Sequence, residues 1–205
     1  MTFLHLVIFA TTIVQQSSTP YQLNQESMTL MSQGKTAAAI EKAREAVRSA
    51  EVSLGVAHPA TAMFLRNLAL TYEVAGNFDA AEASATRSLA ILERDFGPND
   101  VSLTPVLNVL AESYAAEGRY LEATRAAMRA IAIGPDAGVH YATALHNAGA
   151  IDENQGRLVE AADYYRKALA ARQTSLPPGH AFTENTRASL ARVEHAEQVA
   201  SVTSR

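Results

Sequence analysis

The chain has 205 residues, of which 48% are hydrophobic and 19% are charged, and this suffices for one globular domain with a continuous core. The net charge is −4 and the 17 Lys and Arg residues are scattered along the chain, so no basic surface is expected to attract nucleic acid. Because there is no cysteine, disulfides, thiolate metal sites and cysteine nucleophiles are excluded.

The first predicted element is the apolar run FLHLVIFATTIV at residues 3–14. It is too short to span a bilayer as a helix, but it has the length of a signal-peptide core. Residues 1–19 are therefore interpreted either as a signal peptide or as an N-terminal apolar segment packed against the body of the protein. The first interpretation predicts a periplasmic or secreted protein, in which a retained leader would be the only membrane anchor. The second predicts a cytoplasmic protein.

Four glycines then recur at nearly constant spacing. They are Gly34, Gly76, Gly118 and Gly156, at intervals of 42, 42 and 38 residues. A leucine stands eleven residues before each glycine and an alanine stands five residues after it: Leu23, Leu65, Leu107 and Leu145, then Ala39, Ala81, Ala123 and Ala161. Repetition on this scale is the signature of a solenoid of stacked structural units.

Each glycine is predicted to form the turn of a helix hairpin, because glycine adopts positive φ at little cost. The leucine marks one face of the first helix, and the alanine allows the second helix to approach closely. The predicted pairs are 21–33 with 36–53, 59–75 with 78–96, 101–117 with 120–133, and 139–155 with 158–174. A single helix at 181–199 is predicted to cap the array. Gly134-Pro135 should make the second helix of the third pair about one turn shorter.

The segment HPATAMFLRNLALTYEVAGNFDAAEASATRSLAILERDFGPND, residues 58–100, resembles a tetratricopeptide repeat (TPR) of the kinesin-light-chain type. The linkers Leu54-Gly55, His58-Pro59, Gly97-Pro98 and Pro178-Gly179-His180 match that type. The resemblance implies an all-α fold, a right-handed α-α superhelix (solenoid) of four TPR-like helix pairs plus a C-terminal capping helix. It covers residues 20–200, in units of about 20–57, 58–99, 100–137 and 138–179 with the capping helix at 180–199. Residues 201–205 form a tail.

Signatures of catalysis and of cofactor binding are missing from the chain. Gly34-Lys35-Thr36 resembles the end of a phosphate-binding loop, but Thr29 stands where that loop needs its first glycine. His58 and His180 occupy equivalent linker positions, which indicates a role at helix starts. No catalytic residue, cofactor or metal is therefore predicted, and the chain is not expected to be an enzyme.

The first helices of such superhelices line a concave groove, and polar residues recur on that side of this chain. The candidate partner-binding residues are Asn24, Arg66, Asn67, Asn108, Glu112, His146, Asn147 and Asn154. Asparagine amides both donate and accept hydrogen bonds, which suits the backbone of an extended peptide. Relatives that bind C-terminal carboxylates use a Lys or Arg with Asn, and Arg66-Asn67 matches only a fragment of that clamp. The alternative is that these residues are simply solvated.

The sequence thus predicts a non-catalytic protein–protein interaction module or scaffold that binds a peptide segment or another protein in its groove. A regulatory or self-assembly module of a larger complex is the second interpretation, and a hydrolase is the third. The oligomeric state and the identity of the partner stay open. Asp152 also stays open, because it stands where the second and third units have Tyr72 and Tyr114. Either the fourth pair packs differently there, or a buried carboxylate has a hydrogen-bonding partner.

Overall fold

A computed structural model of the chain describes residues 18–203, so the apolar run at residues 3–14 lies outside the described residues. The first helices of the four pairs are α1 (Pro20–Ser32), α3 (Pro59–Val74), α5 (Thr104–Ala116) and α7 (Val139–Asn154). The second helices are α2 (Thr36–Ser53), α4 (Phe78–Phe96), α6 (Tyr120–Ile133) and α8 (Leu158–Ser175), and α9 (Ala181–Thr203) follows them. Two short 3-10 helices, Val101–Leu103 and Pro135–Ala137, precede α5 and α7. Across residues 18–203, none of the helices combines the length and the apolar character needed to cross a membrane.

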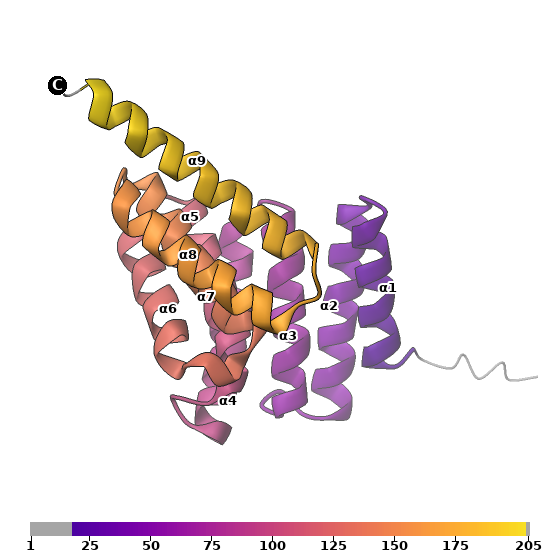
Figure 1. Ribbon diagram of the computed structural model, residues 1–205. Helices are drawn as coiled ribbons and strands as arrows, with labels where there is room; N and C mark the ends of the chain where they lie inside the picture. The colour runs from indigo at the N-terminus through magenta and orange to yellow at the C-terminus, as the bar shows by residue number, and fades with distance from the viewer. Residues whose placement is uncertain (1–17, 204–205) are drawn as a thin grey trace, which may run out of the picture.

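The helices stack in chain order into a curved array, which confirms the predicted all-α superhelix (Figure 1). Each helix packs against the next one along the chain. The first helices also contact one another across units, α1 with α3, α3 with α5 and α5 with α7. The first helices therefore lie on the inner side of the curve, and the second helices form its outer side.

The repeated glycines form the hairpin turns as predicted. Their φ angles are +71°, +74°, +73° and +75° in chain order. The residue after each glycine donates its backbone N–H to a carbonyl in the last turn of the first helix, as Lys35 does to Leu30 at 2.9 Å and Asn77 does to Tyr72 at 2.9 Å. This pattern is the Schellman motif, which satisfies carbonyls left free at a helix end. Lys35 therefore occupies an ordinary position in a repeat turn.

Two histidines in the linkers between units cap the N-termini of the helices that follow them, α3 and α9. His58 Nδ1 accepts from the backbone N–H of Ala60 at 3.0 Å, and His180 Nδ1 accepts from that of Phe182 at 3.2 Å. Both side chains thus replace the Ser or Asp usually found at a helix N-cap. Pro105 lies in the first turn of α5, where its missing N–H leaves no hydrogen bond unmade.

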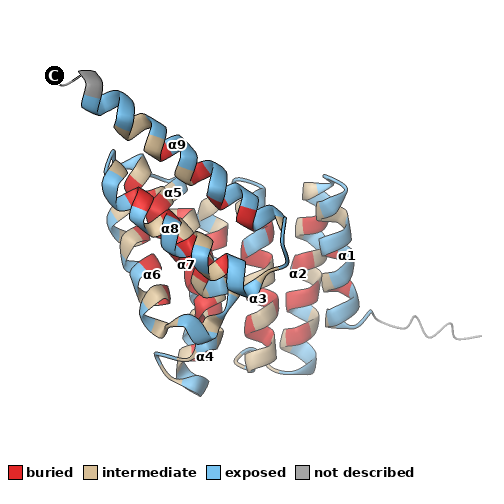
Figure 2. Cartoon of the chain, viewed as in Figure 1, coloured by how far each residue is buried: buried red, intermediate tan, exposed pale blue. Residues whose placement is uncertain are grey.

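Buried residues lie along the faces where the helices pack against one another (Figure 2). Where the two helices of a pair cross, the buried side chains are small. The alanines five residues after the turn glycines are completely buried, and they are Ala39, Ala81, Ala123 and Ala161. Hydroxyl groups bridge the same crossings, because Ser27 donates to the Ala39 carbonyl at 2.9 Å and Ser88 donates to the Ala62 carbonyl at 2.7 Å. Only small residues leave the backbones close enough for such bonds.

The fourth pair uses a different combination of residues at its crossing. Where the first three units place Ser27, Ala69 and Ala111 against alanines, the fourth places Gly149 against the fully buried Tyr165. A Cβ atom on Gly149 would lie 2.9 Å from Cδ1 and from Cε1 of Tyr165. The glycine therefore makes room for the aromatic ring.

Asp152 has the hydrogen-bonding partner that one interpretation required. Arg157 Nε donates to Asp152 Oδ1 at 3.1 Å, and Arg157 Nη2 contacts the same oxygen. Arg157 is also the residue that follows the turn glycine of this unit, so the turn itself places the cation beside the buried carboxylate.

Helix α9 packs on α8 in the position of a fifth first helix, and it projects beyond the array (Figure 1). Its buried residues are Thr183, Thr186, Ser189 and Val193. Its other sides are largely exposed, as Figure 2 shows. This arrangement agrees with the predicted capping role. The predicted shortening of the third pair is also present, because α6 has 14 residues against 19 in α4.

Replacing Gly149 by alanine tests the crossing in the fourth pair. In an open helix interior, a glycine-to-alanine change stabilises by about 1 kcal/mol. Here the added methyl group would press on Tyr165, so we expect destabilisation by about 1–3 kcal/mol, measured by urea unfolding. A more stable variant would show that the ring does not need the space.

Candidate functional site

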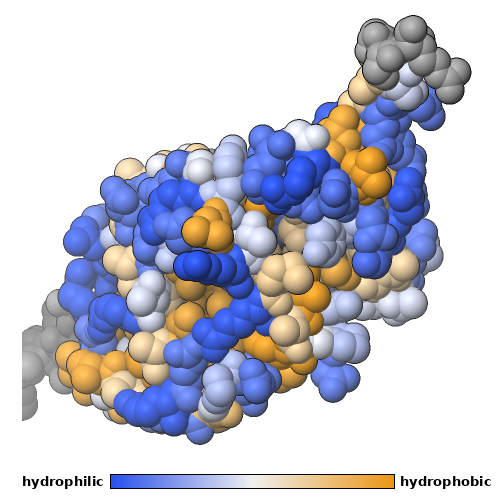
Figure 3. Space-filling view, turned by 90° about the vertical axis from the view of Figure 1, so that its left-hand side faces the viewer, coloured by the Kyte–Doolittle hydropathy of each residue, from blue (hydrophilic) through white to orange (hydrophobic). Residues whose placement is uncertain are grey.

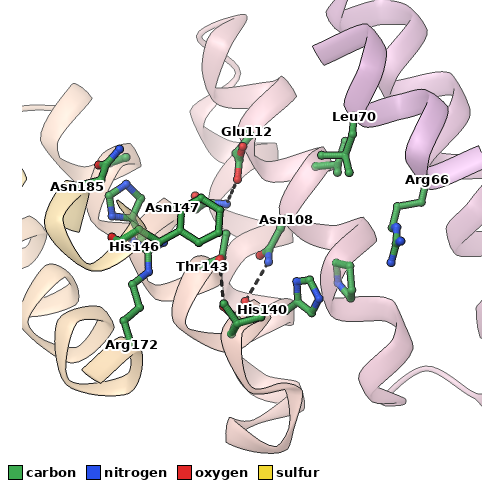
Figure 4. Close-up of a pocket in the computed structure, with 15 residues that line it drawn as sticks. Arg66, Leu70, Asn108, Glu112, His140, Thr143, His146, Asn147, Arg172 and Asn185 are labelled. Carbon is green, nitrogen blue, oxygen red and sulfur yellow. Dashed lines mark hydrogen bonds between the residues drawn. The ribbon is translucent and has the colours of Figure 1, made fainter. Parts of the chain in front are cut away.

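A groove of about 620 Å³ lies on the concave side, between α3, α5, α7, α8 and the start of α9 (Figure 4). Its apolar wall includes Leu70, Pro105, Val109 and Ala150. Polar side chains from α3, α5 and α7 converge on the same space. The groove thus combines an apolar lining with a few polar groups, as ligand sites usually do.

Some of the residues proposed from sequence meet in this groove and others do not. Those that line it are Arg66, Asn108, Glu112, His146 and Asn147. Asn24 and Asn67 lie nearer the N-terminal end, where Asn67 Nδ2 donates to Asn24 Oδ1 at 2.9 Å. Asn154 is exposed at the end of α7, and it does not line the groove.

The amides in the groove are oriented by the protein itself. Asn108 Nδ2 donates to the His140 carbonyl at 2.9 Å, and Asn147 Nδ2 donates to Glu112 Oε1 at 2.8 Å. Asn108 Oδ1 is buried and has no hydrogen-bonding partner among the described residues. These hydrogen bonds fix the orientation of both amides and use one of the two N–H groups of each.

Two arginines reach the groove from opposite ends, as Figure 4 shows. Arg66 donates to Asn67 Oδ1 from Nε at 3.3 Å and from Nη2 at 3.0 Å. Arg172 donates from Nη1 to the Phe182 carbonyl and to Thr186 Oγ1. Neither arginine forms an ion pair with a carboxylate of residues 18–203. Burial lowers the pKa of both guanidinium groups from its ordinary value.

Two carboxyl groups on neighbouring first helices interact beside the groove. Burial, and then a hydrogen bond and charge repulsion from Glu112, raise the pKa of Glu73 to about 9. Glu73 is therefore protonated near neutral pH. Near neutral pH, Glu73 therefore adds no negative charge beside Glu112.

The two histidines of α7 both line the groove and are both poor bases. Desolvation, and then the charge of Arg66, lower the pKa of His140. Burial, followed by the charges of Arg172 and Arg192, lowers the pKa of His146 to about 4. His146 is thus neutral near pH 7. In the part of the chain that the structure describes, no group of three or more His, Asp or Glu side chains is arranged to hold a metal ion.

Two apolar lining residues, Leu70 and Ala150, were missed although the repeat carried a signal for them. Like the predicted Glu112, they stand six residues before a turn glycine, four residues after the position that suggested Arg66 and His146. Residues four apart share a helix face, so the whole column could have been assigned to the groove. No such periodicity identifies Arg172, which belongs to a second helix. Its place in the groove depends on how α8 and α9 pack.

Hydrophilic and hydrophobic residues are unevenly spread over the surface. On the face shown in Figure 3, hydrophilic side chains predominate on the outside, and a hydrophobic band crosses the middle. Single exposed apolar residues are ordinary on a protein surface, whereas a continuous apolar area often marks a contact site.

Family models described as tetratricopeptide repeat match residues 23–94, 64–136 and 142–181. No curated protein matches the chain. Among solved structures, the kinesin-light-chain protein with nearly identical TPR-like repeats from Podosopora anserina is 19% identical, with a TM-score of 0.68 over 89% of this chain and 90% of that one. BtubC (BKLC) from P. vanneervenii is 21% identical, with a TM-score of 0.72 over 87% of this chain and 72% of that one.

A Rap protein complexed with competence and sporulation factor is 16% identical, with a TM-score of 0.75 over 90% of this chain and 51% of that one. These structural similarities show the fold, and the repeats support a protein-interaction scaffold. The matches at residues 23–136 span more than half of the sequence and coincide with the helix pairs described above, so the chain belongs to the tetratricopeptide repeat family.

Proposed function

We propose that the chain is an interaction module whose concave groove binds an extended segment of a partner protein. The main support for this proposal is the set of polar side chains that line the groove. It presents the oriented amides of Asn108 and Asn147 between Arg66 and Arg172, two arginines that have no carboxylate partner in residues 18–203. Buried charged groups are normally paired, so these two arginines favour a bound ligand that complements them.

An extended backbone suits the groove in size and in chemistry. A volume of about 620 Å³ is within the usual range for ligand pockets and can hold a few residues of a peptide. A backbone N–H group of such a peptide could donate to the oxygen of Asn147. Apolar side chains of the peptide would pack against Leu70 and Val109, which belong to the apolar wall.

The charge of the groove also limits what it can bind. His140 and His146 have lowered pKa values, and the Glu73–Glu112 pair retains a proton near pH 7. Arg66 and Arg172 are then the positive charges of the groove. A segment with acidic residues complements this balance better than a basic one.

Replacing Leu70 by aspartate tests whether the groove is the binding site. Leu70 is 42% exposed, so the fold should tolerate the change, but a charge on the apolar wall would oppose an apolar ligand side chain. We expect peptides selected on the wild-type protein from a random display library to bind about tenfold more weakly, measured by fluorescence polarisation.

The matched control is Leu121→Asp, because Leu121 is a 63% exposed leucine on the second helix α6. It should leave peptide binding unchanged. If Leu121→Asp abolishes binding and Leu70→Asp does not, the ligand binds the outer side of the array. If the library yields no binding peptide, the groove is not a peptide site.

The raised pKa of Glu73 predicts how stability depends on pH. Because the pKa is about 9 in the folded chain and near 4.5 when unfolded, folding takes up a proton between these values. The free energy of unfolding should therefore fall as the pH rises from about 5 to about 9. Glu73→Gln removes this titration, so its stability should depend less on pH and exceed that of the wild type at the alkaline end. Thermal unfolding curves of equal pH dependence would contradict the assignment.

A further inference from the structure

Ion pairs connect the second helices of neighbouring units, except between the third unit (α5 and α6) and the fourth (α7 and α8). The pairs at the first two junctions are Arg87–Glu51 between α4 and α2, and Arg119–Glu82 and Arg129–Glu93 between α6 and α4. Among residues 18–203, no ion pair connects α8 to α6. The Tyr164 hydroxyl of α8 contacts Met128 Sδ of α6 at 3.4 Å, but a thioether is a weak acceptor.

The sequence explains why this third junction differs. Arg119 and Arg157 both follow a turn glycine. Arg119 pairs with Glu82, which stands six residues after the turn glycine of the preceding unit. Before Arg157 that position holds Thr124, which has no charge. Arg157 therefore pairs with Asp152 inside its own unit, and the arginine that connects the second and third units makes no connection here.

The linker of the third junction also lacks the contacts that hold the earlier linkers. Arg94 of α4 donates to the Ala57 carbonyl in the first linker at 2.5 Å. Arg129 of α6 donates to the Pro98 carbonyl in the second linker at 2.9 Å. In the part of the chain that the structure describes, no side chain hydrogen-bonds to residues 134–138, the third linker. Neighbouring helices therefore do not fix its position in the same way.

The backbone of the third linker suits a hinge. Gly134 and Gly138 bound it, with φ angles of +104° and +57°. Gly138 precedes α7 without a side-chain cap, whereas Asp100 accepts from the backbone N–H of Ser102 at 2.9 Å in the second linker. Hinges are short segments whose few residues absorb changes in φ and ψ, and glycine has the widest range of both.

On the concave side the same junction is closed. Asn108 Nδ2 donates to the His140 carbonyl at 2.9 Å, and Asn147 Nδ2 donates to Glu112 Oε1 at 2.8 Å. The apolar core also continues from α5 and α6 into α7. A junction that is held on its inner side and free on its outer side opens outward. Such an opening bends the array more tightly around the groove.

We infer that the third junction is a hinge, about which α7, α8 and α9 rotate as one body against α1–α6. The fully buried Tyr165 of α8 holds these three helices together, because it packs in one cluster with Val193 of α9 and Ala150 of α7. The groove crosses the hinge, from Leu70 on α3 to Phe182 on α9, so the rotation changes its width. The inference concerns the free chain and does not depend on what the groove binds.

Distance measurements between spin labels test the hinge on the full chain, which has no cysteine of its own. Four exposed positions stand fourteen residues after the turn glycines, one on each second helix: Arg48, Ala90, Ala132 and Ala170. Label pair A, Arg48→Cys with Ala132→Cys, spans the first two junctions. Label pair B, Ala90→Cys with Ala170→Cys, spans the second and third. By double electron–electron resonance, we expect the distance distribution of pair B to be about twice as wide as that of pair A. Equal widths would overturn the inference.

Two variants exchange the residues that distinguish the junctions. Thr124→Glu with Asp152→Tyr gives the third junction the residues that the second has in Glu82 and Tyr114, and it should narrow the distribution of pair B alone. Glu82→Thr removes the ion pair at the second junction and should widen the distribution of pair A. It changes one partly exposed side chain, so the fold should persist even if the double variant does not fold. Unchanged widths in Glu82→Thr would contradict the role given to the ion pair.

A third label pair separates rotation of one body from movement of α9 alone. Ala170→Cys with His195→Cys places both labels beyond the hinge, on exposed positions of α8 and α9. We expect this distribution to be as narrow as that of pair A. A distribution as wide as that of pair B would show that α9 moves on its own, and the inference would be wrong.

Discussion

The close approach of the two helices in each pair is the constraint on which the rest of the structure depends. At every crossing a small residue of the first helix meets an alanine or, in the fourth pair, Tyr165 opposite Gly149. Glycine with positive φ makes the turn short enough to hold the helices at that distance. Because each pair repeats this geometry, neighbouring pairs stack with a constant offset, and the array curves with its first helices inside.

The groove is a consequence of this stacking. Residues that recur at fixed positions before the turn glycines face the inside, which brings Leu70, Glu112 and Ala150 into one column. Helix α9 continues the stack by one helix and closes the groove at its C-terminal end with Phe182 and Asn185. The same packing that stabilises the fold thus decides which side chains a ligand meets.

Local patterns made most of the fold predictable from sequence. The turn glycines, the histidine-capped helix starts, the shorter α6 and the single last helix all depend on residues close together in the chain. The site was only partly predictable, because its hydrogen bonds join distant residues. Asn147 is held by Glu112 and Asn67 by Asn24, so two amides expected to bind a ligand have internal partners. Arg172 reaches the groove only through the packing of α8 on α9, for which the repeat contains no signal.

Hydrogen–deuterium exchange of the full chain, with and without a peptide selected on it, tests the central claim most directly. The account predicts that bound peptide slows exchange in α3, α5 and α7 and at the start of α9, because these elements line the groove. Exchange in α2, α4 and α6 should change little. Slower exchange confined to α2, α4 and α6 would place the partner on the outer side and contradict the account.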